Sequence, residues 1–241
     1  MENSENLNNH NSLTRKYFKV LGLILILLFP AIFYFVLTSG KHNMLSLPYF
    51  GEREPIKVMV NGKEKIDTLY HSIPDFSFIN QFGDTVTQKN YEGKIYIADF
   101  FFTTCPGICP KMSAQMHYLE ERLKDYNDVM FLSHTVDPEK DTVEALAAYS
   151  KLVHANTKRW NFVTGSKESI YKQALYGYLV NADEDILAPG GFLHSELFVL
   201  VDKNKHIRGF YDGTSVDQAK KLIDAVKVLI AEEQIPRKSH K

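Results

Sequence analysis

The chain has 241 residues, of which 44% are hydrophobic and 24% are charged. These values exclude a disordered protein, and the length provides for one domain of about 150 residues plus additional segments. The formal net charge is -1, and no long basic run lies away from the ends of the chain, so the sequence argues against a nucleic-acid-binding protein.

The first element is an uncharged run of eighteen residues, Val20–Leu37, which is about the minimum for a helix that crosses a bilayer. Three basic residues precede it, and the positive-inside rule therefore places the N-terminus in the cytoplasm. We expect a cytoplasmic tail at 1–16, a single transmembrane helix at 17–39 in a bacterial inner membrane, and the remainder on the periplasmic or outward side. A cleavable signal peptide is the alternative, but the run is longer than a usual signal core.

A connector is predicted from 40 to 74, and it contains a β-hairpin. Two short extended runs flank Asn61 and Gly62, and an Asn-Gly pair is a strong signal for a two-residue hairpin turn because both residues accept positive φ. We therefore expect an accessory hairpin ahead of the main domain.

The main domain is predicted at 75–234, followed by a flexible tail at 235–241. Apolar β-rich runs indicate strands, and apolar residues at helical spacing indicate helices. The predicted elements are a strand at Lys94–Phe102, a helix at Pro110–Asp125, a strand at Val129–Val136, a helix at Asp141–His154 capped by Asp141 or Thr142, a strand at Arg159–Gly165, a helix at Ser166–Leu179, two strands within Ser195–Gly213 and a helix at Ser215–Glu233. This order predicts an α/β fold with a mixed sheet and helices on both of its faces.

Both cysteines of the chain lie in the stretch "FFFTTCPGICPKM", after the first strand of the main domain. Cys105 is expected in the turn that leaves the strand, and Cys109 at the start of the next helix. We expect the helix N-terminus to lower the pKa of one or both thiols. A disulfide between them is feasible, but closing so small a loop adds little stability. Three residues between the cysteines suit a metal ion held by two thiolates, so redox chemistry and metal binding both remain open.

Two thiolates leave most metals short of ligands, and the nine histidines are the candidates for a third. His194 is the strongest, because it follows a Gly-Gly loop and precedes an apolar strand expected beside the Cys105 strand. His117 and His134 are weaker candidates. An ordinary hydrogen-bonded loop histidine is the alternative for His194.

Three segments, "GKIYIADFFFTTCPGICPKM", "TVDPEKDT" and "GFLHSELFVLVDKNKHIRGFYDG", resemble in their order the signatures of the Sco/SenC family of membrane-anchored copper proteins. The similarity runs from about Ile73 to about Ile230. It implies a thioredoxin-like fold with an added hairpin and a single N-terminal anchor. It also implies a copper site formed by Cys105, Cys109 and His194, with Asp137 in a supporting role.

The resemblance further implies a copper chaperone that helps to assemble the binuclear copper site of cytochrome c oxidase. Its partner would be subunit II of the oxidase or another copper- or thiol-exchange protein. Soft thiolates favour Cu(I), and an added imidazole lets such a site hold Cu(II) as well. In this interpretation the disulfide between the cysteines is the oxidised, metal-free state.

Three other functions remain open at this stage. A thiol:disulfide oxidoreductase would use Cys105 as the attacking thiolate and Cys109 as the resolving thiol. A peroxidase of the peroxiredoxin type is a weaker alternative, because its reactive cysteine needs neither a second cysteine at this spacing nor His194. A zinc site with two cysteines and one histidine is chemically reasonable, although the predicted location outside the cytoplasm and the redox-capable pair favour copper.

Overall fold

The structure is a computed structural model that describes residues 46–60, 62–180 and 195–234, together with a few positions between 19 and 34. The predicted tails at 1–16 and 235–241 lie outside these residues, as does most of the predicted membrane helix at 17–39. Within the described residues, no helix is both long enough and apolar enough to cross a bilayer. The chain forms two compact units, Met1–Met44 and Leu45–Lys241, and the second contains the main domain.

The main domain is built on a seven-stranded mixed sheet with strand order β4-β3-β7-β6-β5-β8-β9. Its strands are β3 (Ser77–Asn80), β4 (Thr85–Thr87), β5 (Ile95–Phe101), β6 (Val129–Thr135), β7 (Trp160–Thr164), β8 (Leu197–Val201) and β9 (Ile207–Asp212). Its helices are α2 (Cys109–Arg122), α3 (Val143–Leu152), α4 (Lys167–Lys172) and α5 (Val216–Gln234), with a 3₁₀ helix η2 (Gln88–Tyr91) and a π-helical turn η3 (Gln173–Gly177). The predicted mixed sheet with flanking helices is confirmed.

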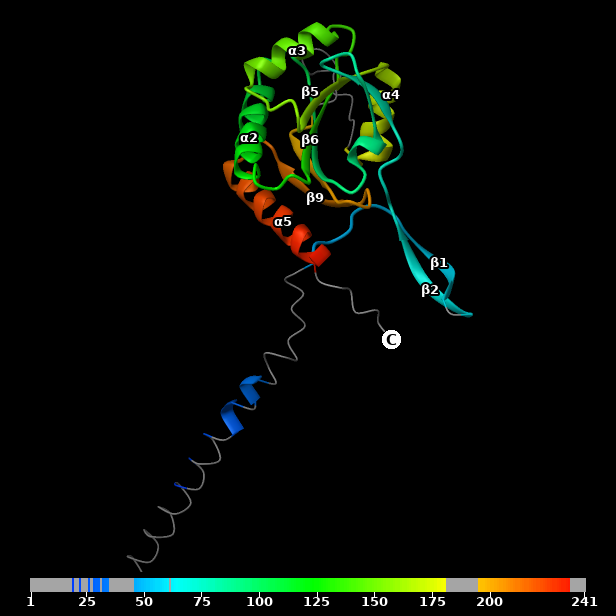
Figure 1. Cartoon of the computed structure of the whole chain (residues 1–241), viewed down its shortest axis with the longest axis vertical. Helices are drawn as coiled ribbons and strands as arrows, with labels where there is room; N and C mark the ends of the chain where they lie inside the picture. Colours follow the sequence, from blue (N-terminus) through cyan, green and yellow to red (C-terminus); the bar gives the residue numbers. More distant parts are fainter. Residues whose placement is uncertain are drawn as a thin grey trace, which may run out of the picture. The chain divides into compact units, whose positions relative to one another are not determined.

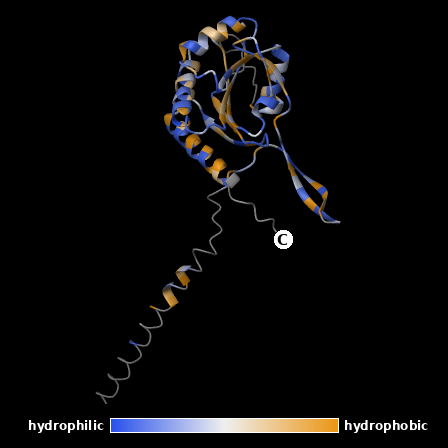
Figure 2. Ribbon diagram, in the orientation of Figure 1, coloured by the Kyte–Doolittle hydropathy of each residue, from blue (hydrophilic) through white to orange (hydrophobic). Residues whose placement is uncertain are grey.

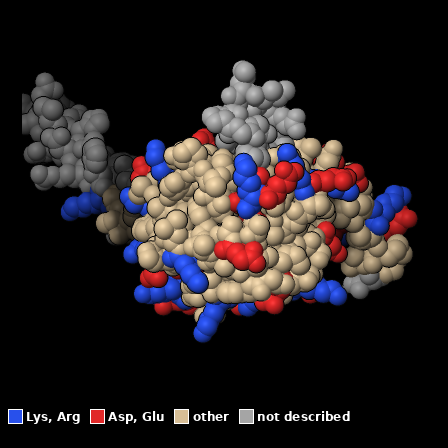
Figure 3. Space-filling view, turned by 90° about the horizontal axis from the view of Figure 1, so that it is seen from above, with Lys and Arg blue, Asp and Glu red and all other residues tan. Residues whose placement is uncertain are grey.

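β5 is an interior strand of the sheet, between β6 and β8, and all seven of its side chains are buried. Burial on both faces requires cover on both, and Figure 1 shows α2 and α5 side by side on one side of the sheet and α4 on the other. Hydrophobic residues are concentrated in the strands (Figure 2), whereas charged residues of both signs are interspersed on the face seen in Figure 3. The buried core is drawn from residues between Ile73 and Leu229, so the second unit has a complete core and is expected to fold alone.

The strands and helices predicted from β5 onward are present, with ends that differ by a few residues. Thr142, rather than Asp141, caps α3, because its hydroxyl accepts the backbone N–H of Ala145 at 3.3 Å. The predicted helix at Ser166–Leu179 is α-helical only to Lys172 and continues as the π-helical turn. Three short elements, β3, β4 and η2, were not predicted.

The predicted hairpin is confirmed as a separate two-stranded sheet of β1 (Arg53–Val60) and β2 (Lys63–Tyr70). Val60 pairs with Lys63, which leaves a two-residue connection, and Gly62 has a φ of +76°. In Figure 1 the hairpin extends away from the sheet.

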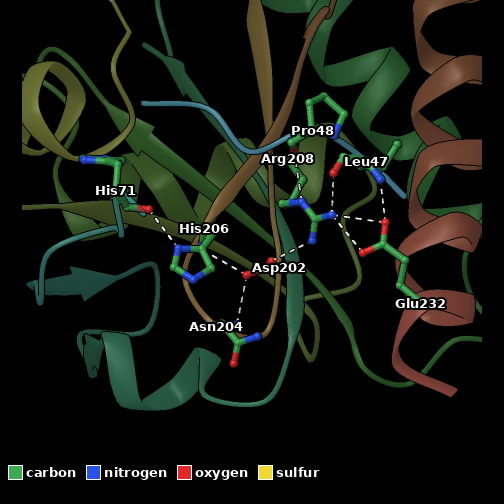
Figure 4. A network of polar contacts seen from close by, with 8 residues as sticks. All are labelled: Leu47, Pro48, His71, Asp202, Asn204, His206, Arg208 and Glu232. Atoms are coloured by element: carbon green, nitrogen blue, oxygen red, sulfur yellow. Dashed lines mark hydrogen bonds and ion pairs between the residues drawn. The ribbon is translucent and has the colours of Figure 1, made fainter. Parts of the chain in front are cut away.

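A buried ion-pair cluster centred on Arg208 holds the start of the second unit (Figure 4). The guanidinium of Arg208 contacts Asp202 at 2.9 Å and Glu232 at 2.8 Å. It also donates to the carbonyl oxygens of Leu47 at 2.7 Å and Pro48 at 3.1 Å. The Arg208 cluster therefore joins the entering chain to the β8–β9 turn and to the end of α5.

We predict that Arg208→Leu lowers the free energy of unfolding by about 3–5 kcal/mol, because the buried carboxylate of Asp202 and the partly buried carboxylate of Glu232 lose their counter-charge. Urea unfolding of the second unit measures the change. Lys94→Met is the control, since Lys94 pairs with the exposed Asp128 at 2.7 Å, and such a pair contributes less than about 1 kcal/mol. Equal losses in the two variants would contradict the prediction.

Candidate metal centre

Three segments of the chain meet at one edge of the sheet, which we call the thiol edge. β5 and β6 are parallel, with Phe101 beside Thr135, so the turns that follow both strands lie at this edge. β8 runs antiparallel to β5, with Ala98 opposite Val199, so β8 begins here. His194 lies outside the described residues, but Ser195, one residue later, is buried just ahead of β8.

Both cysteines lie where the sequence predicted, in the turn after β5 and at the start of α2. The backbone N–H of Cys105 donates to the carbonyl oxygen of Phe102 at 3.2 Å, which closes the turn. Cys109 is the first residue of α2, and Pro110 suits the first helical turn because it has no N–H to satisfy. Both are free thiols, Cys105 half-buried and Cys109 only 3% exposed. Cys105 is thus partly accessible from the surface, whereas Cys109 is enclosed by the protein.

Burial raises the pKa of the Cys109 thiol well above its usual range, and the neighbouring Cys105 thiol adds to the rise. The expectation that the helix N-terminus lowers the pKa of one or both thiols is therefore wrong for Cys109. Desolvation of the thiolate outweighs the helix dipole at a position this deeply buried. A metal ion that binds the Cys109 sulfur must displace its proton, which makes binding dependent on pH.

The carboxylate of Asp141, a residue predicted only as a possible helix cap, fixes the turn that carries Cys105. Asp141 is fully buried and accepts hydrogen bonds from the backbone N–H of Thr103 at 3.1 Å and from the Thr103 hydroxyl at 2.5 Å. It also accepts the hydroxyl of Thr135, at the end of β6. Asp141 thus ties the cysteine turn to the neighbouring strand, and the second Asp of the D-P-x-x-D-T motif was the available signal.

Asp137 lies at the thiol edge, in the turn after β6, and is buried. Its backbone N–H donates to the Thr135 hydroxyl at 3.1 Å, and its carbonyl accepts the N–H of Asp141 at 2.9 Å. Its carboxylate faces Lys140, with an N–O distance of 3.3 Å. Within the part of the chain that the structure describes, these contacts of Asp137 shape the turn that presents Asp141, and none of them reaches a cysteine.

Behind the thiols lies a buried acid on β5, Asp99, which is 2% exposed. Burial raises the pKa of Asp99 to about 7, although a hydrogen bond with Ser133 acts in the opposite direction. The charge of Asp99 also contributes to the raised pKa of Cys109. A protonatable carboxyl group is therefore electrostatically coupled to the inner thiol.

The two weaker histidine candidates have other surroundings. His134 is fully buried in an aromatic cluster, stacked on Phe100 with ring centroids 4.9 Å apart, and burial lowers its pKa to about 3. His117 lies on α2 with Nδ1 3.8 Å from a carboxylate oxygen of Glu120. Among the residues that the structure describes, no group of three His, Cys, Asp or Glu side chains is arranged to hold a metal ion.

Comparisons with known proteins agree on one family. A family model described as SCO1/SenC matches residues 65–231. The SCO1 protein homolog of Bacillus subtilis is 32% identical over 170 residues, which cover 69% of this chain and 86% of that protein. The solved structure of BsSco, a member of the Sco family of cytochrome c oxidase assembly proteins with a disulfide switch, is 29% identical, has a TM-score of 0.59 and covers 66% of this chain and 94% of its own. Arabidopsis thaliana ScoI, solved with copper bound, is 28% identical, with a TM-score of 0.54 and coverages of 64% and 98%.

We predict that Asp141→Ala lowers the free energy of unfolding by about 2–4 kcal/mol, because buried donors on Thr103 and Thr135 lose their acceptor. The freed turn should also expose Cys105, so iodoacetamide should alkylate Cys105 faster than in the parent protein. Thr142→Ala is the matched control: loss of the α3 cap costs about 1 kcal/mol without touching Thr103. An unchanged alkylation rate in Asp141→Ala would show that the turn holds without this carboxylate.

The stability of the protein should depend on pH through Asp99. The pKa of Asp99 is about 7 in the folded protein, against an ordinary value of 3.8, so the folded state keeps a proton that the unfolded chain releases. Stability contributed by this group therefore falls as pH rises from about 4 to about 7, by up to about 4 kcal/mol. Asp99→Asn removes this titration, so the unfolding free energy of the parent minus that of the variant should decline across the window. A constant difference in urea unfolding between pH 4 and pH 8 would refute the shifted pKa.

Proposed function

The chain belongs to the SCO1/SenC family, and from this we propose that it is a membrane-anchored copper chaperone that carries its cargo on Cys105, Cys109 and His194. The observation that carries the proposal is the pair of thiols one helical turn apart after the interior strand β5, one half-buried and one buried. Two thiolates at this spacing provide the soft donors that Cu(I) prefers, and the imidazole of His194 permits Cu(II) as well.

The unequal exposure of the two thiols suits a protein that passes copper on. A ligand of the acceptor can reach a metal ion first from the side of Cys105, which is half-buried, while Cys109 still holds the ion from inside. The turn from Thr103 to Pro110 contains no charged residue, so an acceptor can approach without displacing an ion pair of this segment. Exchange by stepwise replacement of ligands follows from this arrangement.

We place delivery at the assembly of the binuclear copper site of cytochrome c oxidase, with subunit II or another copper- or thiol-exchange protein as the partner. Two related proteins support this. BsSco belongs to the Sco family of cytochrome c oxidase assembly proteins, and Arabidopsis ScoI was solved with copper bound. Residues 17–39 would anchor the chain in the bacterial inner membrane, with the N-terminus in the cytoplasm and the main domain outside. Asp137 has a supporting role in this proposal, through the turn that presents Asp141.

A second candidate function is thiol:disulfide exchange by the same pair, and the disulfide switch of BsSco favours keeping it. The Cys105 thiolate would attack a partner disulfide and form a mixed disulfide, and one partner sulfur would leave as a thiolate. Cys109 would then attack Cys105 and release the second partner thiol. The two cysteines become oxidised to a disulfide as the partner disulfide is reduced.

We predict that a reduced protein comprising residues 46–241 of the second unit binds one Cu(I) under anaerobic conditions. Cys105→Ala, Cys109→Ala and His194→Ala should each weaken binding by at least about tenfold, because each removes one of three donors. Titration against a chromophoric Cu(I) chelator measures the change, and His154→Ala, at an exposed histidine, is the control. Absence of copper binding by the reduced parent, or exclusive uptake of zinc when both metals are offered, would refute the chaperone.

The same variants separate the two candidate functions. His194→Ala leaves both thiols in place, so it should lose stable copper binding while its rate of reduction of a model disulfide stays close to that of the parent. In Cys109→Ala the exchange reaction should stop at the mixed disulfide between Cys105 and the partner, because the resolving thiol is missing. If His194→Ala loses both activities together, the assignment of His194 as a copper ligand alone is wrong.

A further inference from the structure

The free end of the β1–β2 hairpin exposes large apolar side chains on both of its faces. We define the hairpin tip as residues 57–60 and 63–66. Side chains alternate between the faces of a strand, and paired residues share a face. Met59 and Ile66, which are 68% and 72% exposed, therefore lie on one face, and Val60, 48% exposed, lies on the other. Neither face of the tip is covered by the main domain.

Apolar side chains on both faces of the tip fit insertion into a lipid bilayer better than docking of one face on a flat protein surface. An isolated two-stranded sheet is only marginally stable in water, and exposed apolar groups in such a sheet mark a site of interaction. A folded protein docked on one face would leave either Met59 and Ile66 or Val60 exposed. The interface of a lipid bilayer, in contrast, encloses a tip from both sides.

The charges of the tip suit a bilayer with anionic lipids. Lys57, Lys63 and Lys65 flank the apolar side chains, against one acidic residue in the tip, Glu64, which pairs with Lys57 at 3.2 Å. Within the described residues no ion pair involves Lys63 or Lys65. Lysine stems can lie along apolar surface while their ammonium groups reach lipid head groups, and anionic head groups attract them.

The connection between the predicted anchor and the described domain is short. Only eight residues, 38–45, separate the end of the uncharged run from Ser46. They span at most about 26–29 Å. The next residues are held by the Arg208 cluster, and the hairpin begins at Arg53. Eight-residue strands reach about 26 Å, so a tethered domain keeps the tip at high effective concentration near the bilayer.

The base of the hairpin lies at the end of the sheet opposite the cysteines. The N–H of Ile73 donates to the carbonyl oxygen of Lys205 at 2.8 Å, and a ring nitrogen of His206 lies 2.8 Å from the carbonyl oxygen of His71. Lys205 and His206 belong to the β8–β9 turn, whereas the thiol edge contains the start of β8. A membrane contact made by the hairpin therefore leaves Cys105 accessible.

We propose that the hairpin tip inserts into the interface of an anionic bilayer and forms a second membrane contact of the domain. The inference rests on the membrane anchoring in the proposed function and is independent of copper binding. A protein partner for the tip is the competing explanation, and the experiment distinguishes the two.

The test uses the second unit alone, since it has a complete core, with an engineered tether in place of the predicted anchor. A hexahistidine tag before Ser46 binds the domain to vesicles that contain a nickel-chelating lipid, in a Cys105→Ser, Cys109→Ser background that prevents nickel binding by the thiols. The fluorescent probe is Met59→Trp, and brominated acyl chains in phosphatidylglycerol vesicles are the quencher. The native Trp160 is 1% exposed and serves as an internal reference.

We expect the brominated lipids to quench Met59→Trp and not Glu139→Trp, a matched probe at an exposed position of the thiol edge. Because tryptophan itself favours the interface, the measurement is repeated with Ile66→Ser and with Lys63→Glu, Lys65→Glu. Both changes should reduce the quenching of Met59→Trp if the native tip makes the contact. Equal quenching of the two probes, or no effect of these changes, would overturn the inference and favour a protein partner. The quenching results depend neither on residues 17–39 acting as an anchor nor on copper binding, so a failure of the proposed function would leave them unchanged.

Discussion

The structure depends on the pairing of β5, which is parallel to β6 on one side and antiparallel to β8 on the other. A strand buried on both faces has no freedom to shift its register, because a shift by one residue would exchange the side chains on its two faces. This fixed register brings the end of β5, the end of β6 and the start of β8 to one edge. Two thiols and the Asp141 carboxylate come together there although they are far apart in the sequence.

Once that edge is formed, the cysteine turn needs no charged residue of its own. Its position is set from outside, by the carboxylate of Asp141 on the loop after β6. The thiols can thus be surrounded by uncharged residues while the turn stays attached to the sheet. The division between a half-buried Cys105 and a buried Cys109 follows, because α2 begins directly against the core.

The parts of the fold that the sequence predicted are those with strong local patterns: the apolar run of β5, the amphipathic helices and the Asn-Gly turn of the hairpin. The strands β3 and β4 were missed because four and three residues are too few to show a period, and their pairing with β7 and each other is set by the rest of the sheet. The pKa of Cys109 was predicted in the wrong direction because local sequence shows the helix start but not the depth of burial. Asp141 was missed as an anchor for the same reason: its partners Thr103 and Thr135 are contacts between strands.

The Arg208 cluster has a mechanical consequence. A force applied to the chain ahead of residue 46 would reach Leu47 and Pro48 first, whose carbonyl oxygens are bonded to Arg208, the partner of Glu232. Arg208 belongs to the edge strand β9 and Glu232 to the long helix α5, and neither lies on β5. The contacts that would bear such a force are thus separate from the hydrogen bonds of Asp141 that hold the cysteine turn.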